Sequence, residues 1–155
     1  MSTEETGTEA VAADAIQLLS RVPYGRVATI MRAMPFVAPA RHIVDDGRVL
    51  LRMHQGFGYH RACAGGVVAY GADNLNSGAA HLWSVQFTGT AEAVEPTDAQ
   101  LAAFGPAPRL VDGEPFAPVY LRVEPRFTTV HALDSATPPS TPQPHPYPES
   151  DISTT

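Results

Sequence analysis

Side chains that could do chemistry are concentrated between residues 41 and 61. Guanidinium, imidazole and phenol groups occur there together: Arg41, His42, Arg52, His54, Tyr59, His60 and Arg61. Guanidinium groups bind anions through charge-assisted hydrogen bonds, and imidazole can transfer protons or ligate a metal near neutral pH. This segment is therefore the strongest candidate for a binding or catalytic site.

The pattern of these residues does not favour a metal centre or a nucleophile. His54 and His60 lack the i, i+4 spacing of paired ligands on a helix, so we expect no metal site. His42 lies in a strand-like stretch, where a structural histidine is commoner than a catalytic base. Cys63 stands between two alanines and is predicted to be a buried, inert thiol.

Two other motifs are given structural interpretations. Gly56–Gly58 reads Gly-Phe-Gly, but it lacks the third glycine and the long following helix of a dinucleotide-binding fingerprint. Asp73 and Asn74 are typical of a turn, although the rim of an active site is the alternative.

The composition excludes several classes of protein. The 155 residues suffice for one domain, and a net charge of −6 argues against non-specific nucleic-acid binding. No apolar run reaches the roughly 18–20 residues of a membrane span. A single cysteine and an acidic N-terminus without signal-peptide features predict a cytoplasmic protein.

Short strand-like segments must position these groups. Strands are predicted over residues 25–31, 35–44, 48–53, 67–71, 83–92, 116–123 and 127–133. Asp45–Gly47 is a hairpin turn signal. The segment from 83 to 92 alternates, with Trp83, Val85 and Phe87 on the face predicted to be buried, where Trp83 serves packing rather than cofactor stacking. Helices are predicted over 11–19, near 59–64, and after Pro96, where Thr97 and Gln100 have capping-box spacing.

The domain organisation follows from these segments. Residues 1–9 form a polar, disordered tail, and residues 136–155 form a Pro-rich tail that cannot build a sheet. Short strands with few helices over residues 10–135 favour a mainly β fold, a six-stranded antiparallel split barrel with short flanking helices.

The order of these elements resembles the pyridoxamine 5'-phosphate oxidase-like, FMN-binding split barrels over residues 10–133. The stretches that carry the resemblance are GRVAT (Gly25–Thr29), PFVAPARHIVDDGRVLLRM (Pro35–Met53) and WSVQFTGTAEAVE (Trp83–Glu95). The resemblance implies a homodimer with FMN between the protomers, acting as an oxidoreductase on a small molecule. The C-terminal extension of pyridoxamine-phosphate oxidase itself is not found.

Carried over by position, the resemblance implies a set of cofactor-binding residues. Arg41 opens the strand that contacts the flavin, and Arg52 takes the basic position on the returning strand. Met53 replaces a usual threonine, Phe57 replaces a serine, and Gly58 or Tyr59 replaces a lysine. The residues predicted to bind the cofactor are Arg41, His42, Arg52, Met53, His54, Tyr59, His60, Arg61 and Ser84.

Alternatives remain open at this stage. Because the phosphate-binding pattern is altered, the barrel could bind haem through His54 or His60, bind a deazaflavin, or have no cofactor and no catalytic role. The catalytic residues are not assigned, although His54, Tyr59 or His60 could assist proton transfer. A third hypothesis makes the Pro-rich tail an adaptor that binds a partner protein.

Overall fold

The computed structural model describes residues 14–134. The tails predicted over residues 1–9 and 136–155 lie outside the described residues. Residues 14–19 are helical and place Ala15 and Leu19 in the core, which agrees with the predicted N-terminal helix over its described part. Among the residues described, no helix is long and apolar enough to cross a membrane.

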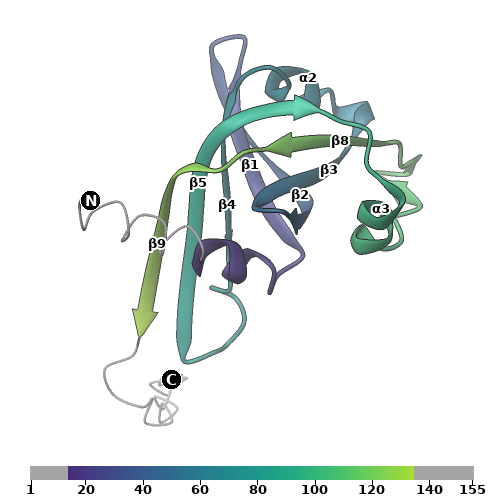
Figure 1. Ribbon diagram of the computed structural model, residues 1–155. Coiled ribbons are helices and arrows are strands. Elements are labelled where there is room, and N and C mark those ends of the chain that lie inside the picture. Colours follow the sequence, from purple (N-terminus) through teal and green to yellow (C-terminus); the bar gives the residue numbers. More distant parts are fainter. Residues whose placement is uncertain (1–13, 135–155) are drawn as a thin grey trace, which may run out of the picture.

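Six antiparallel strands close into a ring, with a seventh strand beside it (Figure 1). The ring follows the order β4-β1-β2-β3-β8-β5 and closes through the pairing of β5 with β4. The seventh strand, β9, pairs only with β5, on the edge where β8 also pairs. The bounds are β1 Tyr24–Met31, β2 Met34–Asp45, β3 Arg48–His54, β4 Val67–Asp73, β5 His81–Ala93, β8 Pro118–Val123 and β9 Arg126–Asp134. The predicted six-stranded antiparallel barrel is confirmed.

Local sequence explains the hairpins and the inward face of β5. Asp46 and Gly47 adopt positive φ of 52° and 72°, as the β2–β3 turn requires. On β5 every second residue is buried, as the alternation predicted: Trp83, Val85, Phe87, Gly89 and Ala91. Gly89 is required where β8 turns into β9, because a Cβ there would overlap the carbonyl oxygen of Glu124.

The core fills the interior of this ring. Its largest fully buried side chains come from β1, β3, β4, β5, β8 and the N-terminal helix: Leu19, Val27, Val49, Leu51, Val68, Tyr70, Val85, Phe87, Leu121 and Val123. Burying a side chain of this size contributes about 1.5–3 kcal/mol. Interior packing therefore holds β2 and β3, on which Arg41 and Arg52 lie outside this core, whereas Met53 belongs to it.

Short helices cover the ends of the barrel. They are the 3-10 helix η1 (Gln55–Phe57), α2 (Tyr59–Cys63) and α3 (Asp98–Phe104). The capping box predicted for α3 is confirmed: the Gln100 N–H donates to Thr97 Oγ1, and the Thr97 N–H donates to Gln100 Oε1.

The segment after α3 was predicted incompletely. Residues 105–117, which we call the cover segment, contain a small hairpin of β6 (Leu110–Val111) and β7 (Glu114–Pro115). The strand predicted over 116–123 begins only at Pro118. Asp112 and Gly113 form the hairpin turn, but two-residue strands are too short to produce an alternating pattern.

Candidate functional site

A cavity of about 180 Å³ lies between β2, β3 and the cover segment. We call it the aromatic cavity. Its lining is mostly apolar, and the sheet adds four polar side chains from Tyr24, Arg41, Arg52 and His54. The other lining residues are Ala38, Pro39, Ala40, Met53, Phe57, Tyr59, Pro108, Val111 and Phe116. Five of the nine residues predicted to bind the cofactor therefore line one cavity.

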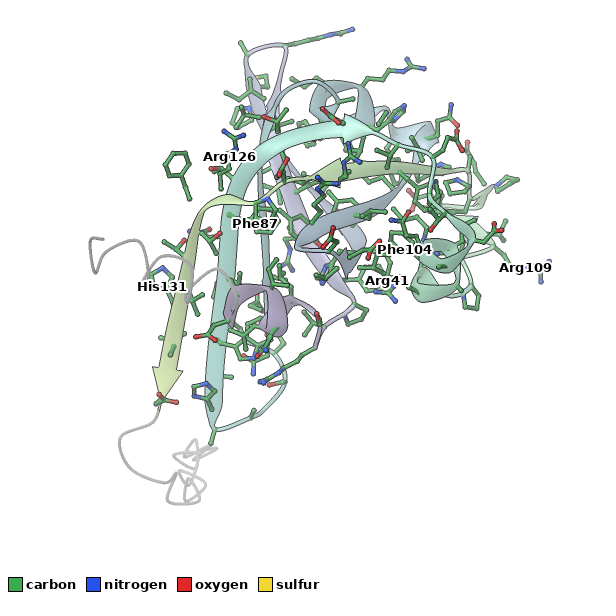
Figure 2. The ribbon with its side chains drawn as sticks, in the orientation of Figure 1. Arg41, Phe87, Phe104, Arg109, Arg126 and His131 are labelled. Atoms are coloured by element: carbon green, nitrogen blue, oxygen red, sulfur yellow. The ribbon has the colours of Figure 1, made fainter. Side chains whose placement is uncertain are left out.

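Two arginines lie side by side in the wall of this cavity. Arg41 of β2 and Arg52 of β3 are direct cross-strand partners, and both bind the carboxyl end of α3. Arg41 donates to the Phe104 carbonyl at 3.2 Å, as well as to Pro23 and His42 carbonyls. Figure 2 shows Arg41 next to Phe104 at the end of this helix.

Arg52 holds the start of the cover segment. It is 5% exposed, donates to the carbonyls of Gly105 and Pro106 at 3.0 and 3.5 Å, and lies over the Phe104 ring. Within residues 14–134 no carboxylate lies within 4 Å of either Arg41 or Arg52. Like charges directly opposite on a sheet repel, and carbonyl partners do not neutralise them, so the cavity wall carries two positive charges.

His54 is fixed in one tautomer. Its Nδ1 accepts the N–H of Ala117 at 3.1 Å, so in the neutral ring the proton lies on Nε2. The ring packs against Phe57 and Phe116, with centroid separations of 4.8 and 5.4 Å. Gly56 leaves room for Nε2, because a Cβ at that position would overlap it. His54 thus presents a hydrogen-bond donor in an aromatic wall.

The aromatic wall continues along α2. Phe57 and Tyr59 lie 5.8 Å apart, and Tyr59 stacks on Phe36 at 4.8 Å. A run of flat side chains beside a cavity is suited to a planar aromatic ligand, since such rings pack face to face or edge to face.

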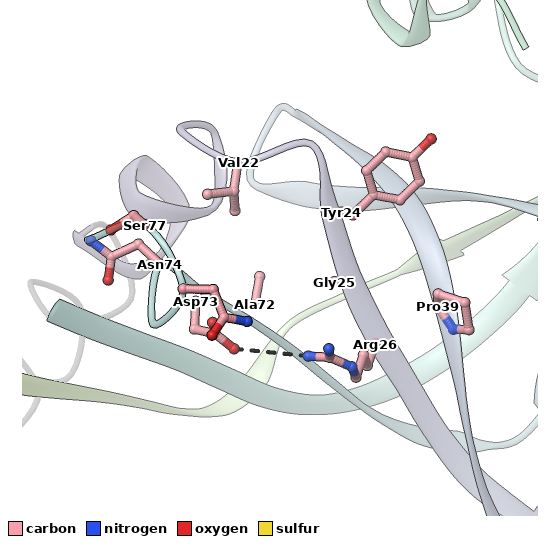
Figure 3. Close-up of a pocket in the computed structure, with 10 residues that line it drawn as sticks. Val22, Tyr24, Gly25, Arg26, Pro39, Ala72, Asp73, Asn74 and Ser77 are labelled. Atoms are coloured by element: carbon pink, nitrogen blue, oxygen red, sulfur yellow. Dashed lines mark ion pairs between the residues drawn. The ribbon is translucent and has the colours of Figure 1, made fainter. Parts of the chain in front are cut away.

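A second hollow, of about 400 Å³, lies beside β1 and the β4–β5 loop (Figure 3). We call it the polar hollow. Tyr24 and Pro39 line both spaces. The remaining lining comes from β1, β4 and the β4–β5 loop: Val22, Gly25, Arg26, Ala72, Asp73, Asn74, Asn76 and Ser77. We refer to these two neighbouring spaces together as the groove.

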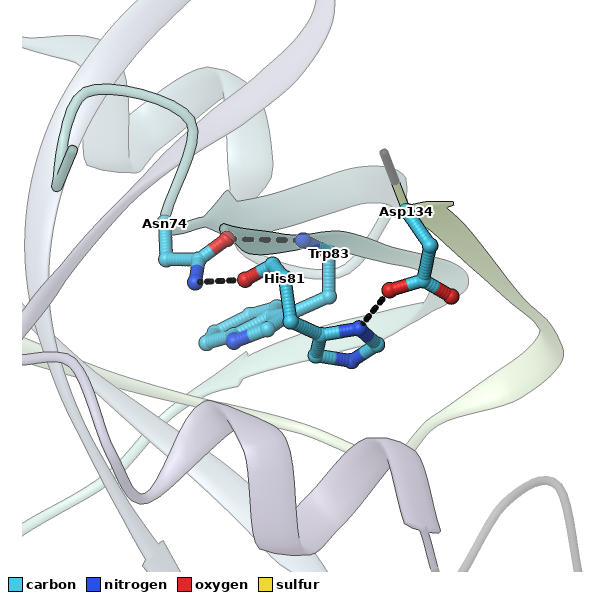
Figure 4. A network of polar contacts seen from close by, with 4 residues as sticks. All are labelled: Asn74, His81, Trp83 and Asp134. Atoms are coloured by element: carbon cyan, nitrogen blue, oxygen red, sulfur yellow. Dashed lines mark hydrogen bonds and ion pairs between the residues drawn. The ribbon is translucent and has the colours of Figure 1, made fainter. Parts of the chain in front are cut away.

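The loop beside the polar hollow is braced by hydrogen bonds (Figure 4). Asn74 accepts the N–H of Trp83 at 2.7 Å and donates to the His81 carbonyl at 3.1 Å. The His81 ring contacts the carboxylate of Asp134 at the end of β9. Asn74 therefore acts in the turn, as predicted, and it also lines the hollow.

The remaining predicted site residues lie away from the aromatic cavity. His60 and Arg61 lie on α2 and Ser84 lies on β5, and none of them lines it. His60 Nδ1 is buried without a hydrogen-bond partner among the described residues, and burial, with a smaller effect of Arg61, lowers the pKa of His60.

His42 points into the barrel rather than toward the cavity. Its Nε2 donates to the Leu19 carbonyl at 2.8 Å, and its Nδ1 contacts the Tyr70 hydroxyl. Burial lowers the pKa of His42 and raises the pKa of Tyr70. Both ring nitrogens have protein partners, so His42 joins the N-terminal helix to the barrel.

Cys63 is also part of the core. It is fully buried, and burial raises the pKa of its thiol to about 11. A thiol with so little thiolate at neutral pH is a poor nucleophile, which agrees with the inert role predicted for it.

Sequence reasoning missed the residues that complete the groove from other segments. Tyr24, Arg26 and Phe116 were not singled out, although Phe57 was noted as a substitution. Tyr24 pairs with Arg41 across β1 and β2, so an explicit register for that hairpin would have placed it there. The position of Phe116 depends on long-range folding of the cover segment and has no local signal.

Comparison with known proteins places the chain in a family. A family model described as pyridoxamine 5'-phosphate oxidase matches residues 12–137. The uncharacterized protein Rv0080 of Mycobacterium tuberculosis is 40% identical over 86 residues, which cover 52% of this chain and 57% of that protein. The match therefore spans little more than half the length of this relative.

Solved structures have the same fold. An FAD-binding protein from Mycobacterium smegmatis has a TM-score of 0.62 at 24% identity, covering 80% of this chain and 96% of that one. An FAD-binding protein from Mesorhizobium loti has a TM-score of 0.59 at 15% identity, covering 79% and 95%. The resemblance inferred from the sequence is confirmed, and the chain belongs to the pyridoxamine 5'-phosphate oxidase family.

Proposed function

We propose that this protein binds the flavin mononucleotide unit of a flavin cofactor in the aromatic cavity and acts as an oxidoreductase on a small molecule. The flavin would supply hydride or single-electron transfer, and the protein would supply binding, orientation and electrostatics. The observation that carries the proposal is the pair of arginines without an acidic partner in the cavity wall.

The arginine pair fits a phosphate group. A guanidinium has five N–H donors, of which Arg41 uses three and Arg52 uses two in the protein. A phosphate dianion would offset the repulsion between the two cations and accept hydrogen bonds from the N–H groups that remain unused. The cofactor-binding role predicted for Arg41 and Arg52 is therefore retained as part of this proposal.

The rest of the cavity fits a planar ring. Met53, Phe57 and Phe116 provide apolar surface, and the His54 Nε2–H provides one donor for a carbonyl or ring nitrogen. Two structurally similar proteins are FAD-binding proteins, which supports a flavin over other planar groups.

The outer face of the sheet supports a homodimer. Val37, Ala28 and Ala69 form one cross-strand row, and Val37 is 64% exposed, as are Ile30 at 66% and Val67 at 67%. A continuous apolar face of this kind is typical of an interface. A second copy on this face would supply the outer wall of the groove, because Tyr24 and Pro39 lie at its margin. The cytoplasmic location stays a prediction from the sequence.

The haem alternative is less compatible with the site. An iron ligand would need the lone pair of His54 Nε2, which requires the proton on Nδ1. That proton would face the Ala117 N–H, a second donor. The haem-bound tautomer would therefore lose a hydrogen bond that the protein now makes.

Absorption spectroscopy and titration test the proposal. We expect the purified protein to bind FMN or FAD with quenching of flavin fluorescence, and Arg52→Gln to weaken binding by about tenfold, as expected for one charge-assisted hydrogen bond. Arg48→Gln is the matched control, because Arg48 is an exposed arginine on the same strand. Protein that binds neither flavin, or that binds hemin with a band abolished by His54→Ala, would refute the proposal.

A further inference from the structure

Hydrogen bonds attach the cover segment to the barrel only near its two ends. At its start, Arg52 donates to the carbonyls of residues 105 and 106 at 3.0 and 3.5 Å. At its end, the Ala117 carbonyl accepts the N–H of residue 55 at 2.7 Å, and the Ala117 N–H donates to the ring of residue 54. Among the described residues, 107–116 make no hydrogen bond or ion pair outside their own stretch. No polar contact therefore ties the middle of the segment to the barrel.

The middle of the cover segment is a small unit of its own. β6 and β7 pair with each other, and the Phe116 N–H donates to the Arg109 carbonyl at 3.0 Å, which closes the base of the hairpin. None of residues 105–117 is buried, whereas Phe104, directly before them, is 2% exposed. A unit with its own hydrogen bonds and no residue in the core can move without disrupting that core.

Gly105 has the properties of a hinge for this unit. Its φ of 74° and ψ of −171° lie in a region that essentially only glycine adopts. Directly after it, Pro106 and Pro108 have a fixed φ, so this part of the segment is stiff. A rotation of the hairpin is therefore absorbed at Gly105, and it separates the Gly105 and Pro106 carbonyls from Arg52.

The inner side of the hairpin forms one wall of the aromatic cavity. Pro108, Val111 and Phe116 line this wall, so moving the hairpin opens the cavity. Arg52 contacts both the cavity and the cover segment, and its guanidinium has N–H donors beyond the two that bind carbonyls 105 and 106. A ligand bound by these donors and packed against the hairpin favours the closed arrangement.

We propose that the cover segment is a lid over the aromatic cavity, hinged at Gly105 and latched by Arg52. The lid opens to admit the ligand and closes on it, so opening of the lid limits the rate at which the ligand dissociates. A ligand that contacts the closed lid shifts the equilibrium toward closure. This inference rests on the proposed function for the identity of the ligand, a flavin, but opening and closing of the lid are properties of the chain alone.

Trypsin cleavage after Arg109 measures how often the lid opens. Arg109 is an exposed residue of the lid, at the outer margin of the molecule (Figure 2), and the rate of cleavage in a segment that opens locally follows the population of the open form. Arg32, exposed in the turn between β1 and β2, is the internal reference. With FMN or FAD at about ten times its Kd, we expect cleavage after Arg109 to slow about tenfold and cleavage after Arg32 to stay unchanged.

Gly105→Ala tests the hinge in the protein without flavin. Alanine is disfavoured at the φ of the closed lid and is relieved when the lid opens, so we expect cleavage after Arg109 to become about tenfold faster. Flavin dissociation should become faster by a similar factor. Gly47→Ala is the matched control, because Gly47 has a φ of 72° and an added Cβ meets no atom within 4 Å at either glycine. It lies in the β2–β3 turn, so it should change neither rate.

Two outcomes would overturn the inference even though flavin binding would stand. One is cleavage after Arg109 that a bound flavin does not slow, and the other is an equal effect of Gly105→Ala and Gly47→Ala. If Gly105→Ala also speeds cleavage after Arg32, the variant has lost global stability, and the effect of flavin on the wild-type protein decides. Failure of the wild-type protein to bind either flavin would instead refute the proposed function, and the two glycine variants would still test the lid.

Discussion

Polar side chains are buried both in the interior of the barrel, at His42, and in the wall of the aromatic cavity. The two regions differ in how completely these side chains are hydrogen-bonded by the protein. At His42 both ring nitrogens meet protein partners, the Leu19 carbonyl and the Tyr70 hydroxyl. In the cavity wall, Arg41 and Arg52 keep unused donors and unneutralised charge. A ligand anion could take up these remaining donors, whereas the His42 ring has no donor or acceptor left for a ligand.

Strand geometry places these two environments next to each other. Arg41 and His42 are consecutive on β2, and successive side chains of a strand point to opposite faces. The same strand therefore delivers one residue to the core and the next to the cavity. A register slip of one residue would exchange them, which makes the β1–β2 and β2–β3 pairings essential to both regions.

Of the substitutions that test this difference, one at His42 is expected to have the largest effect, a loss of stability. His42→Ala removes the bonds to Leu19 and Tyr70 and leaves a cavity, so we expect a loss of about 3 kcal/mol in the free energy of unfolding. Urea unfolding measures it. Flavin titration of the folded variant should give the wild-type affinity, and a large loss of affinity there would contradict the separation of the two regions.

A substitution beside the aromatic cavity is expected to have a smaller effect, a loss of flavin affinity. Gly56→Ala places a Cβ against His54 Nε2 and forces the ring away from the Ala117 N–H. Displacements of this kind cost about 1–3 kcal/mol, and we expect a loss of flavin affinity of at least about fivefold.

A second glycine provides the control for this substitution. Gly66→Ala would bring its Cβ to 3.6 and 3.7 Å from the Cys63 and Ala62 carbonyls, which is ordinary contact. We expect it to leave flavin affinity unchanged, measured by the same fluorescence titration. Equal effects of the two substitutions would show that His54 does not need its present position.

The smallest effect expected is the pH dependence of stability. Burial lowers the pKa of His42 below its ordinary value of 6.5, so below that pH the unfolded chain takes up protons that the folded protein resists. The contribution of His42 should be constant above about pH 7 and fall as the pH drops through about 6. His60 acts in the same direction.

A variant separates the two histidines. His42→Gln should reduce the difference between urea midpoints measured at about pH 7.5 and about pH 5.5, leaving only the part that His60 contributes. An unchanged difference would mean that His42 is not the group responsible.

Most of the barrel could be predicted from the sequence because its signals are local. The Asp45–Gly47 turn and the alternation along β5 depend on neighbouring residues, and both were confirmed. The hairpin of β6 and β7 was missed because two-residue strands have no periodicity.

The candidate site could be predicted only in part because it is assembled from distant segments. Five of the residues predicted between β2 and α2 line one cavity, but the cover segment reaches them across more than fifty positions. The predicted site included both Arg41 and His42. Consecutive residues of a strand point to opposite faces, so the sequence already indicated that these two side chains would not face the same space. Tyr24 and Arg26 belong to no sequence motif. The register in which β1 pairs with its neighbours places them beside the two spaces.

The pairing of β3 with β8 also has a kinetic consequence. It joins Val49 to Val123, so the ring closes only when two distant parts of the chain meet, and barrels that depend on such contacts fold in milliseconds to seconds. Until then β3 has an open edge, and Arg52 lacks the acceptors that follow α3. Because a ligand of the finished groove binds only the closed form, adding it during refolding should increase the yield of native protein by trapping the product of this late step.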